Sequence, residues 1–311
     1  MSDNIIFSVA AGYTFGDIAL FLGSLKKTGF NGSVYIFVSD MNFINRYALE
    51  GCGVNIIACQ KRFPFYRSKI DIPYKLSTKT LNRLGAEYYR FIIYYLFLKS
   101  RLKEFQGKNI LLTDIRDVVF QKDPFEYSYD KGKLYFFAED KGCSIQQNNF
   151  NSSWIRILYG STVLGEISKY PCICSGIIMG PTEKIIVHLE KMTRHICNVR
   201  QVVKGGDQAI HEFIIYKEGV SDYEILNNED GPAIHLHTLE AKDISIDENG
   251  YLRNRSNAIV NIVHQYDRHP FLREEFLQKY NLVKSYPNKL YVFLDKATSL
   301  ITVLICRLKN T

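Results

Sequence analysis

Short apolar runs alternate with stretches of helical spacing along most of this chain. Residues 110–112 (Ile-Leu-Leu) form a continuous apolar run, which is typical of a central strand buried on both faces. Such strands joined by helices predict an α/β fold. Strands are predicted at residues 4–11, 34–38, 54–59, 110–112, 134–140, 172–180, 234–237 and 259–263. Helices are predicted at residues 18–27, 42–49, 81–103, 154–165, 183–200, 209–216 and 271–280.

The predicted central strand ends in a cluster of polar residues. Thr113, Asp114, Arg116 and Asp117 directly follow the apolar run. Polar groups at the end of a buried strand are costly unless they meet a ligand, a metal ion or each other. Ligands bind outside the carboxyl ends of the strands in open α/β sheets, so this cluster is a candidate site. A structural salt bridge between Asp and Arg within the turn is the alternative.

The longest predicted helix, residues 81–103, is apolar or aromatic nearly all round, which predicts deep burial. Arg90 lies inside this apolar stretch. A buried arginine needs an anionic partner. The partner is either a carboxylate of the protein or a phosphate of a ligand, because a guanidinium group binds both equally well.

Two further predicted strands carry polar residues. Residues 134–140 end in Glu139 and Asp140, and the strand at 172–180 contains Ser175 and Gly176. Glycine inside a strand often marks the close approach of a ligand or of another backbone. Residues 62–79, which are rich in aromatic and basic side chains, are either a loop over the active site or a structural surface segment.

Two glycines precede an acid–amide pair at residues 205–208. They allow a tight turn that presents the side chains of Asp207 and Gln208. The alternative is that Asp207 simply caps the following helix. Both interpretations remain open.

Histidines lie on two predicted strands near the C-terminal end of the apolar pattern. His235 and His237 share one face of a strand, because side chains alternate along it. A histidine on a strand is usually a hydrogen-bonded core residue. His264 differs, because it ends an apolar strand and polar residues follow it at once, which favours a functional role.

The composition is that of a globular protein with a large core. The chain has 311 residues, of which 46% are hydrophobic and 14% aromatic. The formal charge of +7 suits anionic small molecules or an anionic membrane surface. It does not indicate nucleic-acid binding, because no recognition motif accompanies it. Neither a GxGxxG nor a Walker A pattern is present, so phosphates must be held by something other than a glycine cradle.

The seven cysteines do not form a zinc or disulfide framework, which predicts a reducing, cytoplasmic setting. Cys172 and Cys174 are expected to face one packed layer as small hydrophobic residues. We expect no signal peptide and no membrane-spanning segment. Residues 286–311 are predicted as a C-terminal helical tail that packs on the domain of residues 1–285, or that lies on a membrane surface.

Taken together, these segments resemble the GT-A nucleotide-sugar glycosyltransferases, nearest to the glycogenin-like enzymes and a bacterial group. The similar features span residues 4–270: the opening strand–loop–helix, Arg90 in a Tyr-rich helix, Thr-Asp-Ile-Arg-Asp117, Ser-Gly-Ile-Ile-Met-Gly180, Gly-Asp-Gln208 and Val-His-Gln-Tyr-Asp-Arg268. The resemblance implies a Rossmann-like GT-A fold with a mixed, mostly parallel central sheet and helices on both faces. It also implies hexosyl transfer from a nucleotide-diphosphate sugar to an acceptor hydroxyl.

A divalent ion is the cofactor that this resemblance implies. The family usually carries Asp-x-Asp, which holds Mn²⁺ or Mg²⁺ on the diphosphate, because hard cations prefer carboxylate oxygens. Here the second acid is Asp117 and Arg116 stands two positions after Asp114. Either Asp114 and Asp117 share the metal, or Arg116 supplies positive charge to the diphosphate. By resemblance, His264 is a further metal or diphosphate ligand.

The resemblance also implies roles for the donor-binding residues. Ala10, Ala11 and Tyr13 would line the nucleotide base, with Arg90 nearby. Thr113, Asp114 and Arg116 would bind the rest of the nucleotide. Ser175 and Gly176 would let the sugar approach the strand, and Asp207 with Gln208 would face the sugar and the acceptor.

The stereochemical course remains open. An inverting enzyme needs a carboxylate to take the proton of the acceptor hydroxyl, and Asp207 and Asp140 are the candidates. A retaining enzyme needs only a polar group such as Gln208 on the donor face.

The expected acceptor is a glycan or lipid-linked sugar in bacterial surface-glycan synthesis, at the inner face of the membrane. One alternative is a nucleotidyltransferase, but residues 10–16 lack the basic residue such a loop needs. The other is a noncatalytic protein that binds nucleotide sugars.

Overall fold

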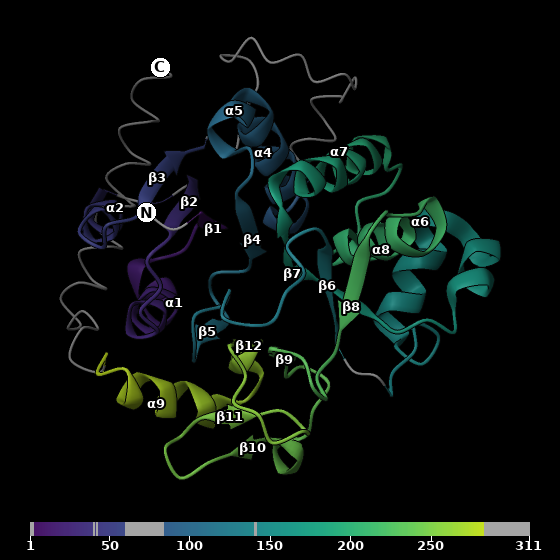
Figure 1. Cartoon of the computed structure of the whole chain (residues 1–311). Helices are drawn as coiled ribbons and strands as arrows, with labels where there is room; N and C mark the ends of the chain where they lie inside the picture. Colours follow the sequence, from purple (N-terminus) through teal and green to yellow (C-terminus); the bar gives the residue numbers. More distant parts are fainter. Residues whose placement is uncertain (1–2, 40, 42, 60–83, 140–141, 283–311) are drawn as a thin grey trace, which may run out of the picture.

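A seven-stranded mixed sheet forms the centre of the fold in this computed structural model (Figure 1). The structure describes residues 3–39, 41, 43–59, 84–139 and 142–282. The strand order is β3-β2-β1-β4-β7-β6-β8. Strand β7 is antiparallel to both of its neighbours, and the other neighbouring strands are parallel. The strands are β1 (Asn4–Ala11), β2 (Ser33–Ser39), β3 (Asn55–Ala58), β4 (Asn109–Thr113), β6 (Leu134–Ala138), β7 (Ile173–Pro181) and β8 (Tyr223–Leu226).

The predicted fold class is confirmed. The sheet is mixed and mostly parallel, and helices lie on both of its faces. Ile110, Leu111 and Leu112 occupy the central strand and are almost completely buried, as their unbroken apolar pattern predicts.

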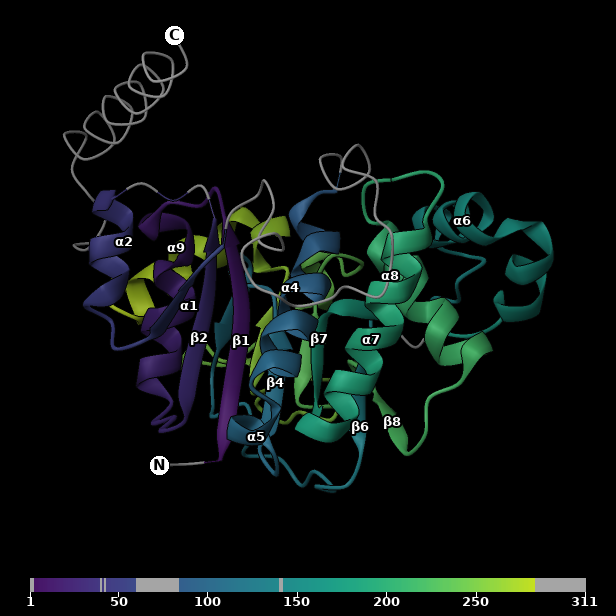
Figure 2. The same cartoon turned by 90° about the horizontal axis from the view of Figure 1, so that it is seen from above.

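One face of the sheet is covered by helices α4, α7 and α8 (Figure 2). Phe7, Phe136 and Ile178 point from the strands into this layer and are fully buried there. Phe7 makes edge contacts with Phe37, at 5.3 Å between ring centroids. The helical segments near this face are α4 (Ala86–Ser100), α5 (Leu102–Phe105), α6 (Asn149–Ile167), α7 (Thr182–Asn198), α8 (Gly206–Phe213) and the π-helical turn Ile214–Glu218.

The other face is covered by α1, α2 and a three-stranded sheet of order β5-β12-β9. Phe21 of α1 packs on Phe120 of this small sheet, and Ser24 Oγ accepts a hydrogen bond from Phe120 N at 3.0 Å. The elements are α1 (Phe15–Lys27), α2 (Phe43–Glu50), β5 (Val118–Phe120), β9 (Ala233–His235) and β12 (Ile262–His264).

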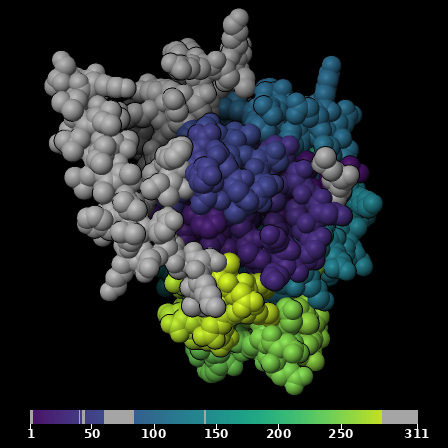
Figure 3. Space-filling view, turned by 90° about the vertical axis from the view of Figure 1, so that its left-hand side faces the viewer, coloured from purple at the N-terminus to yellow at the C-terminus, as the bar shows by residue number. Residues whose placement is uncertain are grey.

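The C-terminal part of the described chain packs against the first helix, α1. Helix α9 packs Leu272 and Phe276 into one apolar cluster with Leu20 of α1. Figure 3 shows α9 (yellow) and the green segment around β10 and β11 below the purple N-terminal elements. The elements are β10 (Ser245–Ile246), β11 (Leu252–Arg253), α9 (Pro270–Lys279) and the 3₁₀ turns Ala241–Asp243 and Tyr266–Arg268.

Most helices differ from their predicted ranges by one or more residues, and in three of them the structure shows a local reason for a difference. Helix α1 begins at Phe15, because Thr14 and Asp17 form a capping box that starts it earlier. Helix α4 begins only at Ala86, because Gly85 is its extended N-cap. Helix α6 is broken at Gly160, whose φ of 89° is not helical.

Strands β5, β8, β10 and β11 fall outside the strands predicted above, and β12 overlaps only the end of the strand predicted at 259–263. The segment at 62–79, Asp140 and the tail at 286–311 lie outside the described residues, so the division at residue 285 stays a prediction. Within the described residues, no helix is long and apolar enough to cross a bilayer.

Candidate functional site

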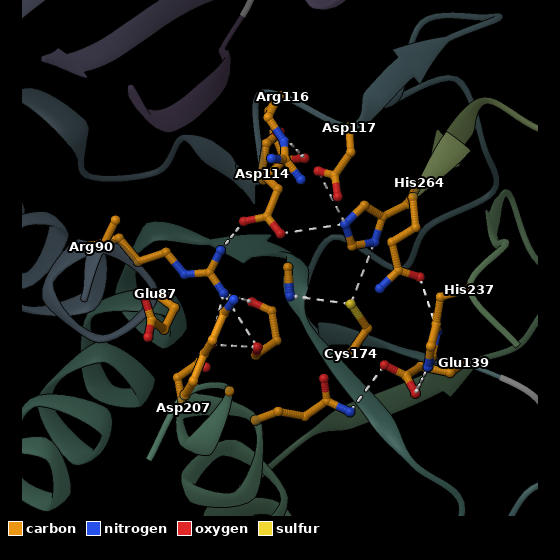
Figure 4. Close-up of a pocket in the computed structure, with 18 of the residues that line it drawn as sticks. Glu87, Arg90, Asp114, Arg116, Asp117, Glu139, Cys174, Asp207, His237 and His264 are labelled. Atoms are coloured by element: carbon orange, nitrogen blue, oxygen red, sulfur yellow. Dashed lines mark hydrogen bonds and ion pairs between the residues drawn. The ribbon is translucent and has the colours of Figure 1, made fainter. Parts of the chain in front are cut away.

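A pocket of about 770 Å³ opens where β1, β4 and β6 end (Figure 4). Its walls come from segments far apart in the sequence, because the sheet order brings these strand ends together. Of the residues predicted for the site, those that line it are Tyr13, Arg90, Thr113, Asp114, Arg116, Asp117, Ser175, Gly176, Asp207, Gln208 and His264.

A bulge in β7 builds the floor of the pocket. Phe136 pairs with Ile178, but the next residue of β6, Phe137, pairs with Cys174. The three intervening residues, Ser175, Gly176 and Ile177, are therefore not paired with β6, although Ile177 still pairs with Thr113 of β4. Bulges of this kind occur next to active sites, where they redirect side chains. The Ser-Gly step that the sequence singles out is the place where the ladder opens.

The acidic turn after β4 is held from both sides. Asp114 N donates to Gly176 O at 2.9 Å, and Gln265 N donates to Asp117 O at 2.7 Å. Ile115 is buried in the core between the two acids. Because Ile115 anchors the turn, both carboxylates remain at the pocket.

Arg116 pairs with a residue outside its own turn, which differs from the alternative interpretation of a salt bridge within the turn. Its Nη2 donates to Asp267 Oδ2 at 2.8 Å, and its side chain is 44% exposed. It also lines the pocket (Figure 4). Arg116 therefore remains a cation at the pocket edge, held by a residue from the segment after β12.

Arg90 joins two acidic residues from different elements. Its Nη1 donates to Asp114 Oδ1, and its Nη2 donates to Asp207 Oδ2 at 3.0 Å. Ser175 Oγ also donates to Asp207 Oδ2, at 2.7 Å. Of the two partners that the sequence left open, the structure shows carboxylates. Charge-assisted bonds of this kind are about twice as strong as neutral ones.

Asp114, Asp117 and His264 converge on one point of the pocket. His264 Nε2 lies 3.3 Å from Asp114 Oδ2 and 3.8 Å from Asp117 Oδ1. One ligand atom from each residue lies within 4.8 Å of the others. His264 Nε2 is buried and has no hydrogen-bond partner in the described part of the chain. A buried nitrogen without a partner is costly, and a divalent cation between it and the carboxylates would satisfy it.

The donor set fits Mn²⁺ or Mg²⁺. Two carboxylates supply the hard oxygen ligands that these ions prefer, and a neutral imidazole adds a nitrogen that commonly binds metal ions in proteins. Burial alone would lower the pKa of His264, but neighbouring Cys174, Asp117 and Glu139 raise that pKa above its usual value. A bound cation would take the place of this proton.

On the side of His264 away from the acids lie two further buried side chains. His264 Nδ1 is 3.0 Å from His235 Nδ1 and 3.5 Å from Cys174 Sγ. Burial lowers the pKa of His235 well below its usual value.

Cys172 and Cys174 have different surroundings. Cys174 contacts His264, whereas Cys172 packs among apolar residues near α6. The expectation that both cysteines face one packed layer is therefore wrong.

Glu139 lines the pocket but was not predicted for the site. Its neighbour Asp140 was chosen from the sequence as a candidate carboxylate. Gln208 Nε2 donates to Glu139 Oε1 at 3.0 Å, and His237 Nε2 lies 3.5 Å from Glu139 Oε2. Burial raises the pKa of Glu139, although His237 and Gln208 oppose this. Its position directly after β6 matches that of Asp114 after β4, and this is the signal that could have found it.

Asp207 is not the cap of its helix. The N-cap of α8 is Gly205, with φ of 83°, and Asp207 lies in the first turn. A Cβ atom on Gly205 would lie 2.4 Å from Trp154 Cζ2, and one on Gly206 would lie 2.1 Å from Tyr88 Oη. The two glycines therefore allow α8 to pack closely enough to present Asp207 and Gln208.

The three residues predicted to line the nucleotide base, at the end of β1, lie in three different surroundings. Tyr13 lines the pocket, and burial raises the pKa of its phenol, opposed by the charge of Arg116. Ala10 is completely buried in the core on the α1 side, and Ala11 packs on the opposite cluster. Neither alanine side chain is among the residues that line the pocket.

The opposite end of the pocket carries aromatic side chains from the start of α6. Phe150 is 70% exposed, and its ring centroid lies 5.9 Å from that of Trp154. The Asn148 side chain accepts from Phe150 N and from Asn151 N, which caps α6 and holds this turn in place. Lys204 lines the same end. None of these residues was predicted for the site.

Known structures identify the fold. A crystal structure of an active-site mutant of LgtC is similar to this chain with a TM-score of 0.50 and 15% identity, covering 92% of this chain and 98% of that one. LgtC, a galactosyltransferase, in complex with donor and acceptor sugar analogues gives a TM-score of 0.48 at 16% identity, with the same coverage. No protein-family model matches the chain, and no curated protein matches it. At such identity the likeness concerns the fold alone, and the fold of this chain is the GT-A glycosyltransferase fold.

Proposed function

We propose that this protein is a glycosyltransferase that moves a hexosyl group from a nucleotide-diphosphate sugar to an acceptor hydroxyl. The observation that carries the proposal is the convergence of Asp114, Asp117 and His264 in the pocket of a GT-A fold. Ligands bind at the carboxyl ends of strands in such sheets, and these residues lie there.

Asp114, Asp117 and His264 would hold Mn²⁺ or Mg²⁺ on the donor diphosphate. The cation would neutralise charge that develops on the leaving diphosphate. Arg116 lines the same wall and adds a second positive group there. The replacement of Asp-x-Asp by Asp-Ile-Arg-Asp therefore keeps two acids for the cation and adds an arginine for the phosphates.

The order of elements across the pocket suggests how the donor lies. Tyr13 follows β1, the acidic turn follows β4, and Ser175 and Gly176 lie on β7, which is the next strand. We therefore place the nucleotide at Tyr13, the diphosphate at Asp114 and Asp117, and the sugar over the β7 bulge.

Asp207 and Gln208 border the proposed sugar position. Asp207 accepts hydrogen bonds from Arg90 and Ser175, which fix its carboxylate for binding a sugar hydroxyl. Gln208 is held by Glu139.

The α6 end of the pocket is where we place the acceptor. Phe150 and Trp154 offer an aromatic surface for the apolar face of a sugar ring, and Lys204 offers a hydrogen-bond donor. A glycan or a lipid-linked sugar fits these groups. A role in bacterial surface-glycan synthesis at the cytoplasmic face of the membrane follows from the family resemblance alone.

Hydrolysis and transfer assays with a panel of nucleotide sugars, with and without Mn²⁺, test the function. We expect turnover of one donor and its loss when the cation is chelated. Turnover of nucleoside triphosphates instead of sugar nucleotides would favour a nucleotidyltransferase. Saturable binding of a nucleotide sugar without any turnover, under conditions that preserve the native fold, would favour a noncatalytic binding protein.

A further inference from the structure

His264 is enclosed by polar groups on both of its ring nitrogens. Its Nε2 faces Asp114 and Asp117, at 3.3 and 3.8 Å, on the pocket side (Figure 4). Its Nδ1 faces His235 Nδ1 at 3.0 Å and Cys174 Sγ at 3.5 Å on the other side. Both histidines and Cys174 are buried.

The short contact between the two imidazoles requires a single proton between them, because two N–H groups would repel each other and two lone pairs would as well. If the proton is on His264 Nδ1, then His264 Nε2 keeps its lone pair and points it at the acids. If the proton is on His235 Nδ1, a neutral His264 carries its own proton on Nε2. That N–H would occupy the place where the cation binds.

A neutral His235 can accept this hydrogen bond on Nδ1 when its own proton is on Nε2, an atom that is buried and has no partner among the described residues. The residue lies on β9, parallel to β12 and paired in register with His264, so the sheet itself sets the two rings side by side. His235 is fully buried and bonds to no carboxylate in the described part of the chain. A second proton that made its ring cationic would therefore be costly. Its backbone N donates to Asn228 Oδ1 at 2.8 Å, and its carbonyl accepts from Asn228 Nδ2 at 2.9 Å, which holds the residue in place.

We propose that His235 is a positioning residue: it accepts the His264 Nδ1 proton and so leaves His264 Nε2 free to bind the divalent cation. Cys174 provides a second, weaker acceptor, since its Sγ already accepts from Gly176 N at 3.2 Å. This inference rests on the proposed function, because it assigns His264 to the cation. It gives roles to a buried histidine and a buried cysteine that the transfer reaction itself does not use.

A soft metal ion held by Cys174, His235 and His264 is the competing interpretation, since their ligand atoms also lie within 4.8 Å of each other. Structural zinc sites are almost always four-coordinate. Among the described residues this cluster supplies three ligands. It would also use His264 Nδ1, so His264 would then face the acids with an N–H group instead of a lone pair.

The test is a Mn²⁺ titration followed by electron paramagnetic resonance, without any nucleotide sugar. In His235→Leu we expect Mn²⁺ affinity to fall by about 10–100-fold, the usual effect of losing a hydrogen-bond partner of a metal-bound histidine. In His235→Gln, whose amide oxygen can still accept, we expect most of the affinity to return. His188→Leu is the matched control, because it removes another buried histidine outside the pocket.

A spectroscopic readout makes the test independent of variant stability. In the wild-type protein, ¹⁵N spectra with Mg²⁺ should show His264 protonated on Nδ1. Protonation on Nε2 would overturn the proposal, as would Mn²⁺ binding by folded His235→Leu at wild-type affinity. Cobalt binding with a thiolate charge-transfer band that Cys174→Ala removes would support the soft-metal alternative. It would also overturn the proposed role of His235. If the wild-type protein binds no divalent cation at all, the cation site of the proposed function is refuted. That result differs from the loss of the His235 role alone, in which the wild type still binds the cation.

Discussion

Gly176 lies directly against the carboxylate of Asp114. A Cβ atom at Gly176 would stand 2.6 Å from Asp114 Oδ2 and 2.7 Å from His264 Cε1, both closer than real Cβ contacts. The absence of a side chain at Gly176 therefore lets the acid and the imidazole meet over the β7 bulge. The proposed cation site therefore depends on this glycine as well as on its ligands.

Replacing Gly176 by alanine should separate Asp114 from His264, because the new methyl group would occupy the space between them. We expect Mn²⁺ affinity to fall on the order of tenfold or more, as it does when metal ligands lose their support. Isothermal titration with Mn²⁺ measures the effect. Gly165→Ala is the matched control, because Gly165 is exposed on α6 and an added Cβ there would have nothing within 4 Å, so binding should stay unchanged. Equal Mn²⁺ affinity in the two variants would contradict this reading of Gly176.

The two acids of the turn should respond differently to substitution. Asp117→Asn removes a proposed cation ligand but breaks no contact with Arg90, so we expect metal-supported activity to disappear with little change in melting temperature. Asp114→Asn removes a ligand and also an ionic partner of Arg90. It should cost roughly 1–3 kcal/mol of stability in addition. Activity assays and thermal melts of both variants provide the comparison, and wild-type activity in Asp117→Asn would remove that residue from the site.

Acid should destabilise the fold through a buried histidine pair on the α7–α8 side. His188 Nε2 and His211 Nδ1 are 3.0 Å apart. Burial lowers the pKa of His188 to about 3 and that of His211 well below its usual value. In the unfolded chain these histidines titrate near ~6.5, so as the pH falls below that value the unfolded state binds more protons than the folded state, and stability decreases.

The measurement is the melting temperature between pH 7.5 and 5. We expect it to fall with pH in the wild type and to fall less steeply in a His188→Phe/His211→Leu variant, which has no pair to protonate. His235, whose pKa is also lowered by burial, accounts for part of the slope that remains. Identical slopes in the two proteins would mean that the pair is not the source of acid sensitivity.

Phe150 should matter for the acceptor and not for the donor. It is 70% exposed at the α6 end of the pocket, away from the proposed cation ligands in the turn after β4 and at the end of β12. An aromatic contact is worth about 0.5–1.5 kcal/mol, so Phe150→Ala should raise the KM for the acceptor by roughly 2–10-fold. Donor hydrolysis should stay unchanged. Phe271→Ala, which removes a partly exposed ring on α9 outside the pocket, serves as the control; equal effects of both variants on the acceptor KM would argue against an acceptor surface on α6.

Most of the fold could be predicted, because its signals are local. The apolar run at Ile110–Leu112 predicts a buried strand whatever its neighbours are, and the spacing of α1 and α7 predicts helices without knowledge of what they pack on. The predicted helix boundaries were less accurate where a capping residue sets the end of the helix, as Gly85 does at the start of α4. Strand β8 carries too weak a pattern to stand out from the loops around it.

The candidate site was predictable only in part. Asp114, Asp117 and His264 stood out because polar residues follow apolar strands directly, and Gly176 because it interrupts one. Phe150 and Trp154 gave no such signal, since aromatic residues at a helix start are more often core. Glu139 and Asp140 were adjacent acids after one strand, and nothing local indicated that Glu139 would bond Gln208.

The sequence alone determined the elements and the residue types at their ends, because hydrophobic periodicity and chain-breaking residues act over a few neighbouring positions. The tertiary structure decided which of these ends meet. Arg90 joins Asp114 and Asp207, and His264 lies between the acidic turn and His235, through contacts between residues far apart in the chain. Strand order and one bulge set those contacts, and the partners of a buried polar group depend on that three-dimensional arrangement rather than on its sequence neighbours.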